Sequence, residues 1–466
     1  MNADAIEQLR NQVSDLVTPD HPDYEQARRV WNWMVDRRPS AVVRAHNEED
    51  AAAAVRFAAE NDVLLAVRGG GHSVAGQSTC DGGLVLDLGP IDQVQVDTDA
   101  EIARAGGGCL LGDVDRACQA KGRAVPAGVV SHTGAGGLTL GGGVGWLTRR
   151  FGLTCDNVVA ARVVLASGEV VVASEDENPD LYWGLRGGGG NFGAVTEFSY
   201  RTHPFPTEIP VAVAYWPLAE AEKVLRVHAE LMPERPREWK ATMFVSRPPA
   251  ARGVPAELVG QPCLNVVQIW ASDDLAAAEA AFEPLRKAAK PAVESLAPMP
   301  YVELQTIEDE IARHGKCNYT KGGYLDDELG DGAIAALLTS AEEIVNEESI
   351  IEVIPHGGAQ LDLGDDDTAF PDRQSAYSFN VYARWALEED DEPHVGWVRR
   401  AFARLDDHAG DGVYVNFFNP HEGGDQDRVL AAFGRERYDR LAQLKRRYDP
   451  ANVFSLNPNI FPAEAA

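Results

Sequence analysis

The sequence lacks the features that mark several classes of protein. No stretch of its 466 residues approaches eighteen consecutive apolar residues, so no membrane-spanning helix is expected. The six cysteines show no CxxC or other metal-ligand spacing, which predicts no metal site and favours reduced thiols in a cytoplasmic protein. The polar, acidic residues 1–15 do not resemble a signal or transit peptide.

Positive charge is also scarce. Asp and Glu number 72 against 42 Lys and Arg, only eight of them lysine, and the net charge is −30. Such a balance repels phosphate backbones and anionic lipids, so neither nucleic acid nor a membrane is expected as a partner. Acidic runs at 365–367 and 388–392 are expected to be solvated loops. The composition is typical of salt-loving organisms, and a GC-rich genome would also produce it.

Glycine is abundant instead, and its 44 residues concentrate at 69–71, 126–157 and 187–193. The first cluster follows an apolar strand at 63–67 and runs directly into His72. Without Cβ atoms, backbone amides can pack against a phosphate, and the adjacent histidine can reach the ligand that carries it. The alternative to a ligand-binding loop is a tight glycine-rich turn next to a histidine that has no functional role. The second cluster is interleaved with hydrophobic residues, which predicts close approach to a large planar cofactor.

The third cluster contains a formal GxGxxG match at Gly188, Gly190 and Gly193. A Rossmann site needs a strand before this motif and a helix after it. Here a helix is predicted before it and a strand after it, at 194–200, so the dinucleotide fingerprint is rejected.

The remaining pattern predicts an α+β protein with a boundary in the proline-rich segment 202–210. Before it, helices are expected at 5–17, 22–36, 48–61 (capped by Asn47), 111–121 and 176–185, and strands at 83–89, 93–97, 101–105 and, as a pair, within 158–173. After it, strands at 211–216, 241–246, 263–271, 350–354, 376–384 and 412–418 alternate with helices near 218–232, 274–289, 332–345 and 393–408. This predicts an antiparallel sheet with helices on one face. A helix at 425–447 and a proline-rich tail that packs back on the first domain complete the chain.

Several motifs occur together along nearly the whole chain: RGGGHS at 68–73, a glycine block at 127–143, GLTCDN at 152–157, GGGGNFGAVTEF at 187–198 and YDPANVFSLNPNI at 448–460. In combination they resemble the berberine-bridge-enzyme-like branch of the vanillyl-alcohol-oxidase superfamily. The resemblance implies N-terminal helices at 1–35, a two-subdomain PCMH-type FAD-binding domain at 36–206, a substrate domain at 207–414 and a C-terminal return at 415–466.

The resemblance also implies a covalent bond between His72 and the flavin 8α carbon. The backbone of residues 69–73 and 133–137 should hold the pyrophosphate. The adenosine side of the cofactor should be lined by Asp156, Asn157 and Val195. The isoalloxazine should lie near Tyr414, Asn416, Asn457 and Asn459. The cofactor-binding residues implied are Arg68, Gly69, Gly70, Gly71, His72, Ser73, Gly76, Val130, Thr133, Gly134, Gly136, Gly137, Gly141, Gly142, Asp156, Asn157, Val195, Tyr414, Asn416, Asn457 and Asn459.

One position departs from the family pattern. Many members form a second flavin bond through a cysteine in the second glycine block, where this chain has Val130. Cys155 lies outside that motif and is expected to be packed and inert. A single attachment, through His72, is therefore expected.

By the same resemblance, several residues of the substrate domain and the segment after it could act on substrate. Tyr414 is the foremost candidate, set in a predicted apolar strand beside the flavin, with a core tyrosine as the alternative. Further candidates are Lys321, together with the nearby Tyr319, and Asp362. For Lys321 and Asp362 the alternative is a surface charge without a catalytic role. Tyr382, Asn380 and Gln360 would form the wall over the ring, and His132 and His356 are weaker candidates.

The activity implied is that of an FAD-dependent oxidoreductase, specifically an oxidase. It would take hydride from a small alcohol, sugar or amine and pass electrons to O2. A dehydrogenase with another electron acceptor, an NADPH-using reductase and a flavin-binding protein without activity remain as alternatives. A base near the flavin, tuned by burial, would take the substrate proton.

Overall fold

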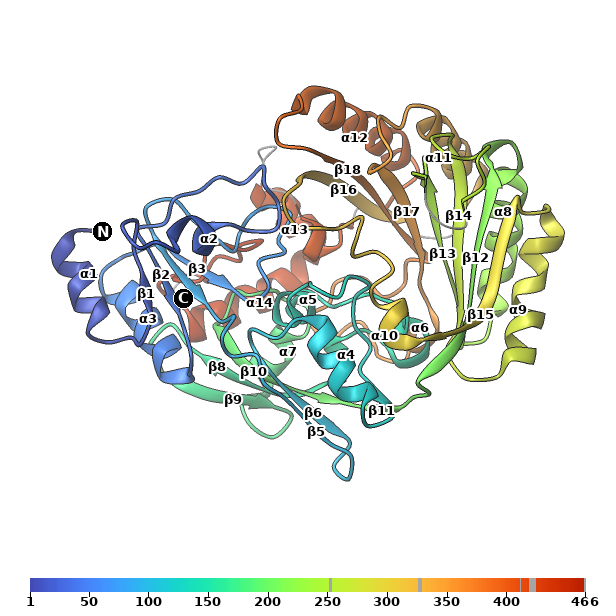
Figure 1. The fold of residues 1–466 in the computed structure, drawn as a ribbon. Coiled ribbons are helices and arrows are strands. Elements are labelled where there is room, and N and C mark those ends of the chain that lie inside the picture. The colour runs from blue at the N-terminus through green and yellow to red at the C-terminus, as the bar shows by residue number, and fades with distance from the viewer. Residues whose placement is uncertain (251–253, 326–328, 411, 419–424, 465–466) are drawn as a thin grey trace.

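The computed structural model describes residues 1–250, 254–325, 329–410, 412–418 and 425–464. Figure 1 shows two halves. One half holds the N-terminal segments, the glycine-rich regions and the C-terminal helices, and the other is built on one large sheet. Among the described residues, no helix has the length and apolar character needed to cross a membrane.

The first half begins with a four-stranded sheet of order β1-β2-β4-β3. Its strands are β1 (Leu16–Val17), β2 (Ala41–Arg44), β4 (Leu84–Asp87) and β3 (Leu65–Arg68), and its helices are α1 (Ala3–Arg10), α2 (Tyr24–Arg28) and α3 (Glu48–Glu60). Helix α3 is capped by Asn47, whose side chain accepts from the Asp50 amide, and its alanine face packs on the strands. Strand β3 runs directly into the first glycine loop.

A five-stranded antiparallel sheet of order β5-β6-β10-β8-β9 completes this half. Its strands are β5 (Val94–Asp97), β6 (Ile102–Gly106), β10 (Ala194–Arg201), β8 (Val158–Val164) and β9 (Val170–Ser174), with a small pair of β7 (Arg123–Ala124) and β11 (His203–Pro204). Associated helices are α4 (Leu111–Gln119), α5 (Ala135–Leu140), α6 (Thr148–Phe151), α7 (Pro179–Leu185), α13 (Asp425–Phe433) and α14 (Arg435–Tyr448), with the short turn η1 (Cys155–Asn157).

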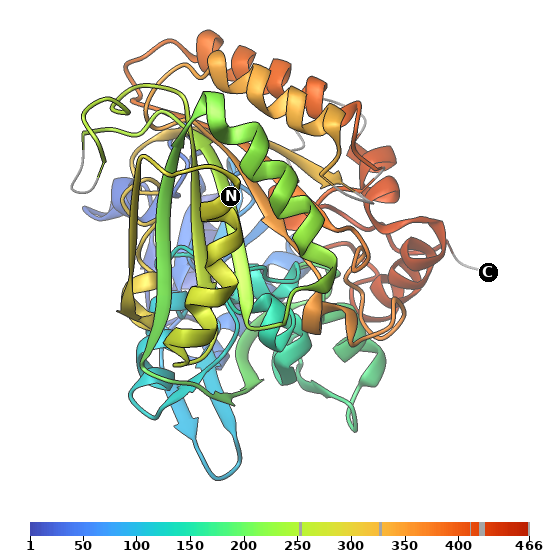
Figure 2. The same ribbon diagram turned by 90° about the vertical axis from the view of Figure 1, so that its right-hand side faces the viewer.

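The second half is a seven-stranded antiparallel sheet with helices on one face, as the sequence predicts (Figures 1 and 2). In spatial order its strands are β15 (Val293–Pro300), β12 (Glu208–Pro217), β14 (Cys263–Trp270), β13 (Trp239–Ser246), β17 (Ile350–Pro355), β18 (Tyr377–Trp385) and β16 (Cys317–Leu325). The covering helices are α8 (Leu218–Leu231), α9 (Leu275–Ala288), α11 (Asp331–Glu342) and α12 (Asp391–Asp406), and α10 (Tyr301–Leu304), η2 (Met232–Glu234) and η3 (Gly358–Leu361) are short connections.

Strands of this sheet alternate between an apolar face and a buried polar face. In β18, Tyr377, Phe379, Val381, Ala383 and Trp385 join the core under the helices. The residues between them, Ser378, Asn380, Tyr382 and Arg384, are also buried but point to the opposite face. Burying polar groups costs free energy unless they find partners, so this second face is built for polar contacts.

Several element boundaries differ from the sequence prediction. Residues 11–15 and 29–36 are not helical, and the predicted strand at 412–418 is a short turn, η4 (Val415–Phe417). The predicted helix at 425–447 is interrupted at Gly434, whose φ of +71° ends one helix and starts the next. Strands β15 and β16 were not predicted, since prolines in β15 and glycines in β16 hide the alternation.

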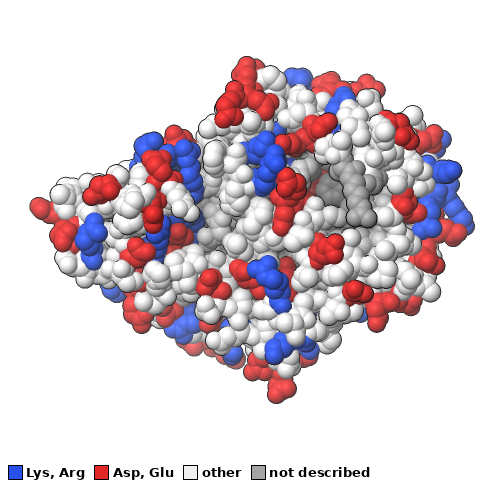
Figure 3. All heavy atoms as spheres, in the orientation of Figure 1, with Lys and Arg blue, Asp and Glu red and all other residues white. Residues whose placement is uncertain are grey.

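Charged residues of both signs are interspersed over the face seen in Figure 3, with no continuous basic patch on it. The acidic run at 365–367 is largely exposed, as expected for a solvated loop.

Candidate active site

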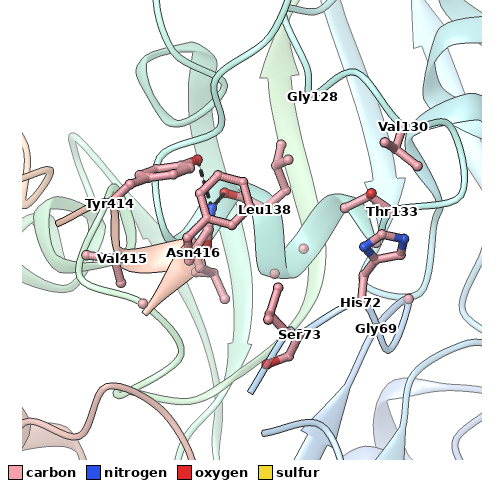
Figure 4. A pocket seen from close by; sticks show the side chains of 18 of the residues that line it. Gly69, His72, Ser73, Gly128, Val130, Thr133, Leu138, Tyr414, Val415 and Asn416 are labelled. Carbon is pink, nitrogen blue, oxygen red and sulfur yellow. Dashed lines mark hydrogen bonds between the residues drawn. The ribbon is translucent and has the colours of Figure 1, made fainter. Parts of the chain in front are cut away.

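A cavity lies between the glycine-rich loops of the first half and the polar face of the large sheet. Figure 4 shows its glycine-loop side. The predicted cofactor residues that line it are Gly69, Gly70, Gly71, His72, Ser73, Val130, Thr133, Gly134, Gly136, Gly137, Val195, Tyr414, Asn416 and Asn457. The large sheet and the segment before β16 contribute Lys240, Thr242, Glu308, Tyr324, Glu352, His356, Ser378, Tyr382 and Arg384. One cavity thus joins a glycine-lined end to an ionisable wall.

The glycine-lined end is formed by two backbones in contact. A Cβ on Gly70 would lie 2.4 Å from the amide nitrogen of Gly134, and one on Gly134 would lie 2.2 Å from that of Gly70. By contrast, a Cβ on Gly137 would meet no protein atom within 4 Å, because this residue is exposed to the cavity. The loops therefore present bare backbone, which suits a phosphate-bearing ligand.

His72 projects from the first glycine loop at one end of the cavity, near Val130 and Thr133 (Figure 4). Its Nε2 lies 3.0 Å from Nδ1 of His132, and its ring stacks on Trp31 with centroids 4.3 Å apart. Burial, reinforced by the neighbouring His132, holds the pKa of His72 well below its ordinary value. The imidazole is therefore neutral at pH 7, with one ring nitrogen unprotonated.

Tyr414 and Asn416 lie across the cavity beside Leu138 (Figure 4). The Tyr414 hydroxyl oxygen accepts from the Gly143 amide and from Nδ2 of Asn416, each at 2.9 Å. The same Asn416 group donates to the Leu138 carbonyl at 3.0 Å. Burial raises the pKa of Tyr414 to about 12. With both lone pairs engaged, this hydroxyl can donate to a ligand but is poorly placed to act as a base.

The C-terminal segment returns to this end of the cavity, where Phe454, Leu456, Asn457 and Pro458 contribute to the lining. Nδ2 of Asn457 donates to the Gly190 carbonyl at 2.9 Å. The segment is held by a fully buried pair, Lys445 and Asp449, at 2.8 Å. Lys445 also donates to the Phe454 carbonyl, so this ion pair fixes the chain that lines the cavity.

The opposite wall carries the ionisable groups. Tyr382 donates its hydroxyl hydrogen to Oε2 of Glu352 at 2.9 Å, and Nδ2 of Asn380 reaches the same oxygen at 3.3 Å. Lys240 donates to the Gly145 carbonyl at 2.6 Å. Oε1 of Glu308 is buried and has no hydrogen-bond partner among the described residues. An acidic pair, a lysine and Arg384 thus meet on one cavity wall.

Burial shifts the protonation of these groups. It raises the pKa of Glu352 and raises that of Glu308 well above its ordinary value, with the charge of Glu352 adding to the effect on Glu308. It lowers the pKa of Lys240 to about 7 and that of His356 to about 3. A carboxyl whose pKa is raised toward neutrality suits proton transfer at physiological pH.

Comparison with known proteins assigns this architecture to a family. A profile for the FAD binding domain matches residues 39–174, and one described as berberine and berberine like matches residues 413–461. The FAD-linked oxidoreductase pgmH of Aspergillus terreus is 30% identical over 486 residues, covering 98% of this chain and 96% of that protein. The chain belongs to the berberine-bridge-enzyme-like FAD-linked oxidoreductases.

Two further matches of this FAD-linked oxidoreductase are to oxidases that act on the same nicotine derivative. The (R)-6-hydroxynicotine oxidase of Paenarthrobacter nicotinovorans is 29% identical over 466 residues, with 96% of each chain covered. The crystal structure of 6-hydroxy-D-nicotine oxidase from Arthrobacter nicotinovorans has a TM-score of 0.85 at 27% identity, covering 96% of this chain and 98% of that one. The recognised family and its PCMH-type fold are confirmed, and the chain is an FAD-dependent enzyme.

The residues of the oxidoreductase fit FAD. Bare backbone at the two glycine loops accepts a pyrophosphate, and a Gly137 side chain would project into that space. Apolar groups of the lining, such as Val67, Leu138 and Phe198, suit the flat rings. Val130 stands near His72, and no cysteine is among the described residues that line the cavity.

Three predicted catalytic residues of the enzyme lie away from the cavity. Tyr319 and Lys321 occupy positions of β16 that face the helices: Tyr319 belongs to the core there, and Nζ of Lys321 lies 4.5 Å from the Phe402 ring centroid in α12. Asp362 is exposed and forms a two-pronged ion pair with Arg237, with both contacts at 2.6 Å. Because alternate residues of a strand point to opposite faces, Tyr319 and Lys321 point away from the cavity. Asp362 lies at the surface, which was the alternative reading of this residue.

Several predicted cofactor residues lie outside the cavity lining and support it. Asp156 is paired with buried Arg373 at 2.6 Å, and Nδ2 of Asn157 donates to the Phe151 and Leu153 carbonyls. Arg68 pairs with Asp87 behind the glycine loop. The others outside the lining are Gly76, Gly141, Gly142 and Asn459, with Gly141 pressed against the Asn416 side chain. Cys155 is buried, and burial raises the pKa of its thiol, as an inert cysteine requires.

The sequence prediction missed Lys240, Glu308, Glu352 and Arg384, which make up most of the charge on the wall. Gln360, predicted for this wall, is buried behind it and bonds His356. A signal was present: Lys240, Glu352 and Arg384 are each the single charged residue of a largely buried strand. A charged residue inside a buried strand requires a partner or a function.

Proposed function

We propose that this enzyme is an oxidase that takes hydride from a small polar alcohol or amine. FAD would be held covalently through His72, and O2 would accept the electrons. The observation that carries the proposal is the cavity itself, because one continuous space joins the glycine cradle to the wall of Glu352 and Tyr382. A substrate bound there lies between the cofactor and a proton acceptor.

Glu352 is the proposed base. Loss of hydride from an alcohol or amine carbon requires removal of the O–H or N–H proton, and a positioned carboxylate contributes about 10²–10⁴-fold to such a step. The Tyr382 hydroxyl, hydrogen-bonded to Glu352 at 2.9 Å, stands ready to relay this proton. Tyr382 is itself no base, because burial holds its pKa well above 10.

The other charged groups of the wall would orient the substrate. Buried Nε and Nη1 of Arg384 and Oε1 of Glu308 have no hydrogen-bond partner among the described residues. Buried polar groups are costly when left unpaired, so a ligand that supplies both donors and acceptors is favoured over an apolar one. Hydroxyl and amino groups meet this requirement.

FAD, when bound, supplies the hydride acceptor and the route to O2. Attachment through His72 is supported by its position on the glycine loop and by its neutral, nucleophilic imidazole. Oxidase activity is supported by the (R)-6-hydroxynicotine oxidase, which matches this chain over 96% of both lengths.

The test is a panel of small polyols, sugars and amines, each measured in two ways. Flavin bleaching without air reports hydride transfer, and hydrogen peroxide formation in air reports the use of O2. Bleaching with peroxide supports the oxidase. Bleaching without peroxide identifies a dehydrogenase, and bleaching by NADPH alone identifies a reductase.

A further inference from the structure

His72 is one of three histidines clustered beside the glycine loop, and the other two have no role in the proposed reaction. Ring centroids of His72 and His132 are 4.9 Å apart, and His314 lies 4.9 Å from His132 and 6.0 Å from His72. Only the His72–His132 pair is joined by a hydrogen bond, between Nε2 and Nδ1 at 3.0 Å. His314 meets both rings without a recorded hydrogen bond to either among the described residues.

This hydrogen bond leaves Nδ1 of His72 as the ring nitrogen that His132 does not engage. When Nε2 of His72 carries the hydrogen and donates it to His132, Nδ1 holds the lone pair. The hydrogen bond therefore couples the tautomers of the two imidazoles. Stacking on Trp31, with an interplanar angle of 19°, fixes the plane of the His72 ring.

His132 is itself held in place from the large-sheet half. The preceding residue, Ser131, donates from its amide to Oδ1 of Asp309 at 2.8 Å and from its hydroxyl to Oδ2 at 2.5 Å. Burial lowers the pKa of His132, and the nearby charge of Asp309 partly offsets that effect. When Nδ1 of His132 accepts from His72, its Nε2 carries the ring hydrogen, and Nδ1 is the atom that takes up a second proton.

We propose that His132 is the positioning residue for flavin attachment: it orients His72 through the Nε2–Nδ1 hydrogen bond and takes the Nε2 proton as the covalent bond forms. This inference rests on the proposed attachment through His72. Its second half, proton acceptance by His132, is supported by the aspartate that braces the loop.

The attachment step balances as follows. The bond between Nδ1 of His72 and the 8α carbon forms, while one C–H bond of the 8α methyl group and the imidazole N–H bond break. Two electrons enter the flavin, and the two released protons equal the two that the reduced flavin takes up. Dioxygen then reoxidises the flavin and leaves as hydrogen peroxide. His132 holds the imidazole proton between its release from His72 and its transfer onward.

The experiment uses the full chain purified from riboflavin-starved cells and mixed with FAD in air. Three quantities are followed: flavin retained in the acid-precipitated pellet over time, non-covalent FAD affinity from quenching of flavin fluorescence, and the melting temperature. The variants are His132→Ala, His132→Asn and the matched control His314→Ala, with His72→Ala as the blank. Asparagine retains an acceptor near the Nδ1 position but takes up no proton.

We expect His132→Ala to bind FAD as the wild type does and to melt at the same temperature, yet to attach it about 100-fold more slowly. His132→Asn should attach FAD at an intermediate rate, and His314→Ala at the wild-type rate. Attachment by His132→Ala at the wild-type rate would overturn the inference. Equal slowing in His314→Ala, or parallel loss of non-covalent affinity, would also overturn it by showing a packing effect. Wild-type flavin that is never acid-stable would refute the attachment itself.

Discussion

Tyr382 and Glu352 share a hydrogen bond of 2.9 Å on neighbouring strands, β18 and β17, and both side chains face the cavity. Their pairing follows from strand register, since Tyr382 lies opposite Ile350 and Glu352 is two residues further along the same face of β17. A proton acceptor is thereby built into the seven-stranded sheet, opposite the loops that fit the cofactor.

Replacing Glu352 tests the proposed base. Glu352→Gln keeps the shape and the hydrogen bond from Tyr382 but accepts no proton, so the rate of substrate-driven flavin reduction should fall by about 10²–10⁴-fold. Rapid mixing without air measures this rate directly. Asp362→Asn is the matched control, because Asp362 is exposed and paired with Arg237. An unchanged rate in Glu352→Gln would remove the carboxylate from the mechanism.

Gly137→Ala separates cofactor binding from folding. The new methyl group meets no protein atom within 4 Å and enters the cavity, and alanine is the better residue inside helix α5. We expect a melting temperature for the FAD-free protein no lower than that of the wild type, with much less FAD bound per chain. Gly330→Ala, whose methyl group also meets nothing but lies outside the cavity lining, should bind FAD fully. Equal FAD content in both variants would contradict the proposal that the glycine loops bind FAD.

The buried pair of Lys445 and Asp449 should govern stability. Asp449→Asn leaves the Lys445 ammonium buried without its counter-charge, which costs about 3–5 kcal/mol. Urea titration gives the change in free energy of unfolding. Glu283→Gln breaks the exposed pair with Lys287 and should cost less than about 1 kcal/mol. A similar loss of unfolding free energy in the two variants would show that the buried pair contributes no more to stability than an exposed one.

Acid should destabilise the protein through its buried neutral histidines. Burial lowers the pKa of His228 to about 3, whereas an unfolded histidine titrates near about 6.5. Between these values the unfolded chain binds a proton that the folded chain does not, so stability is full above about pH 6.5 and falls as pH decreases through this window. In His228→Gln the slope of unfolding free energy against pH should be shallower by up to about 1.4 kcal/mol per unit. Equal slopes in urea titrations from about pH 5 to 7.5 would contradict this assignment.

The sequence predicted the elements whose signals are local. The Asn47 cap, the strand leading into the first glycine loop and the helices over the large sheet could be predicted because apolar period and capping residues mark them. Gly434 and the turn after Tyr414 were missed, since one positive φ angle or one short turn leaves the surrounding apolar pattern unchanged.

The site was predicted best where backbone makes it and worst where side chains do. His72 and its glycines are contiguous in sequence, so their proximity needs no fold. Glu352, Tyr382 and Lys240 meet only through strand order and register, which a motif does not contain. Lys321 illustrates the same limit. A lysine is chemically suited to the site, but the alternation of side chains along β16 points this one toward the helices and away from the cavity.

The most direct test of the account is the absorption spectrum of the acid-precipitated protein. Wild-type protein is denatured in acid, washed, and examined for flavin in the pellet, with His72→Ala treated in parallel. The account predicts flavin absorbance in the wild-type pellet and none in that of His72→Ala. Flavin that washes out of both would contradict covalent attachment, and purified wild-type protein that neither contains nor takes up FAD would contradict the assignment of the cavity.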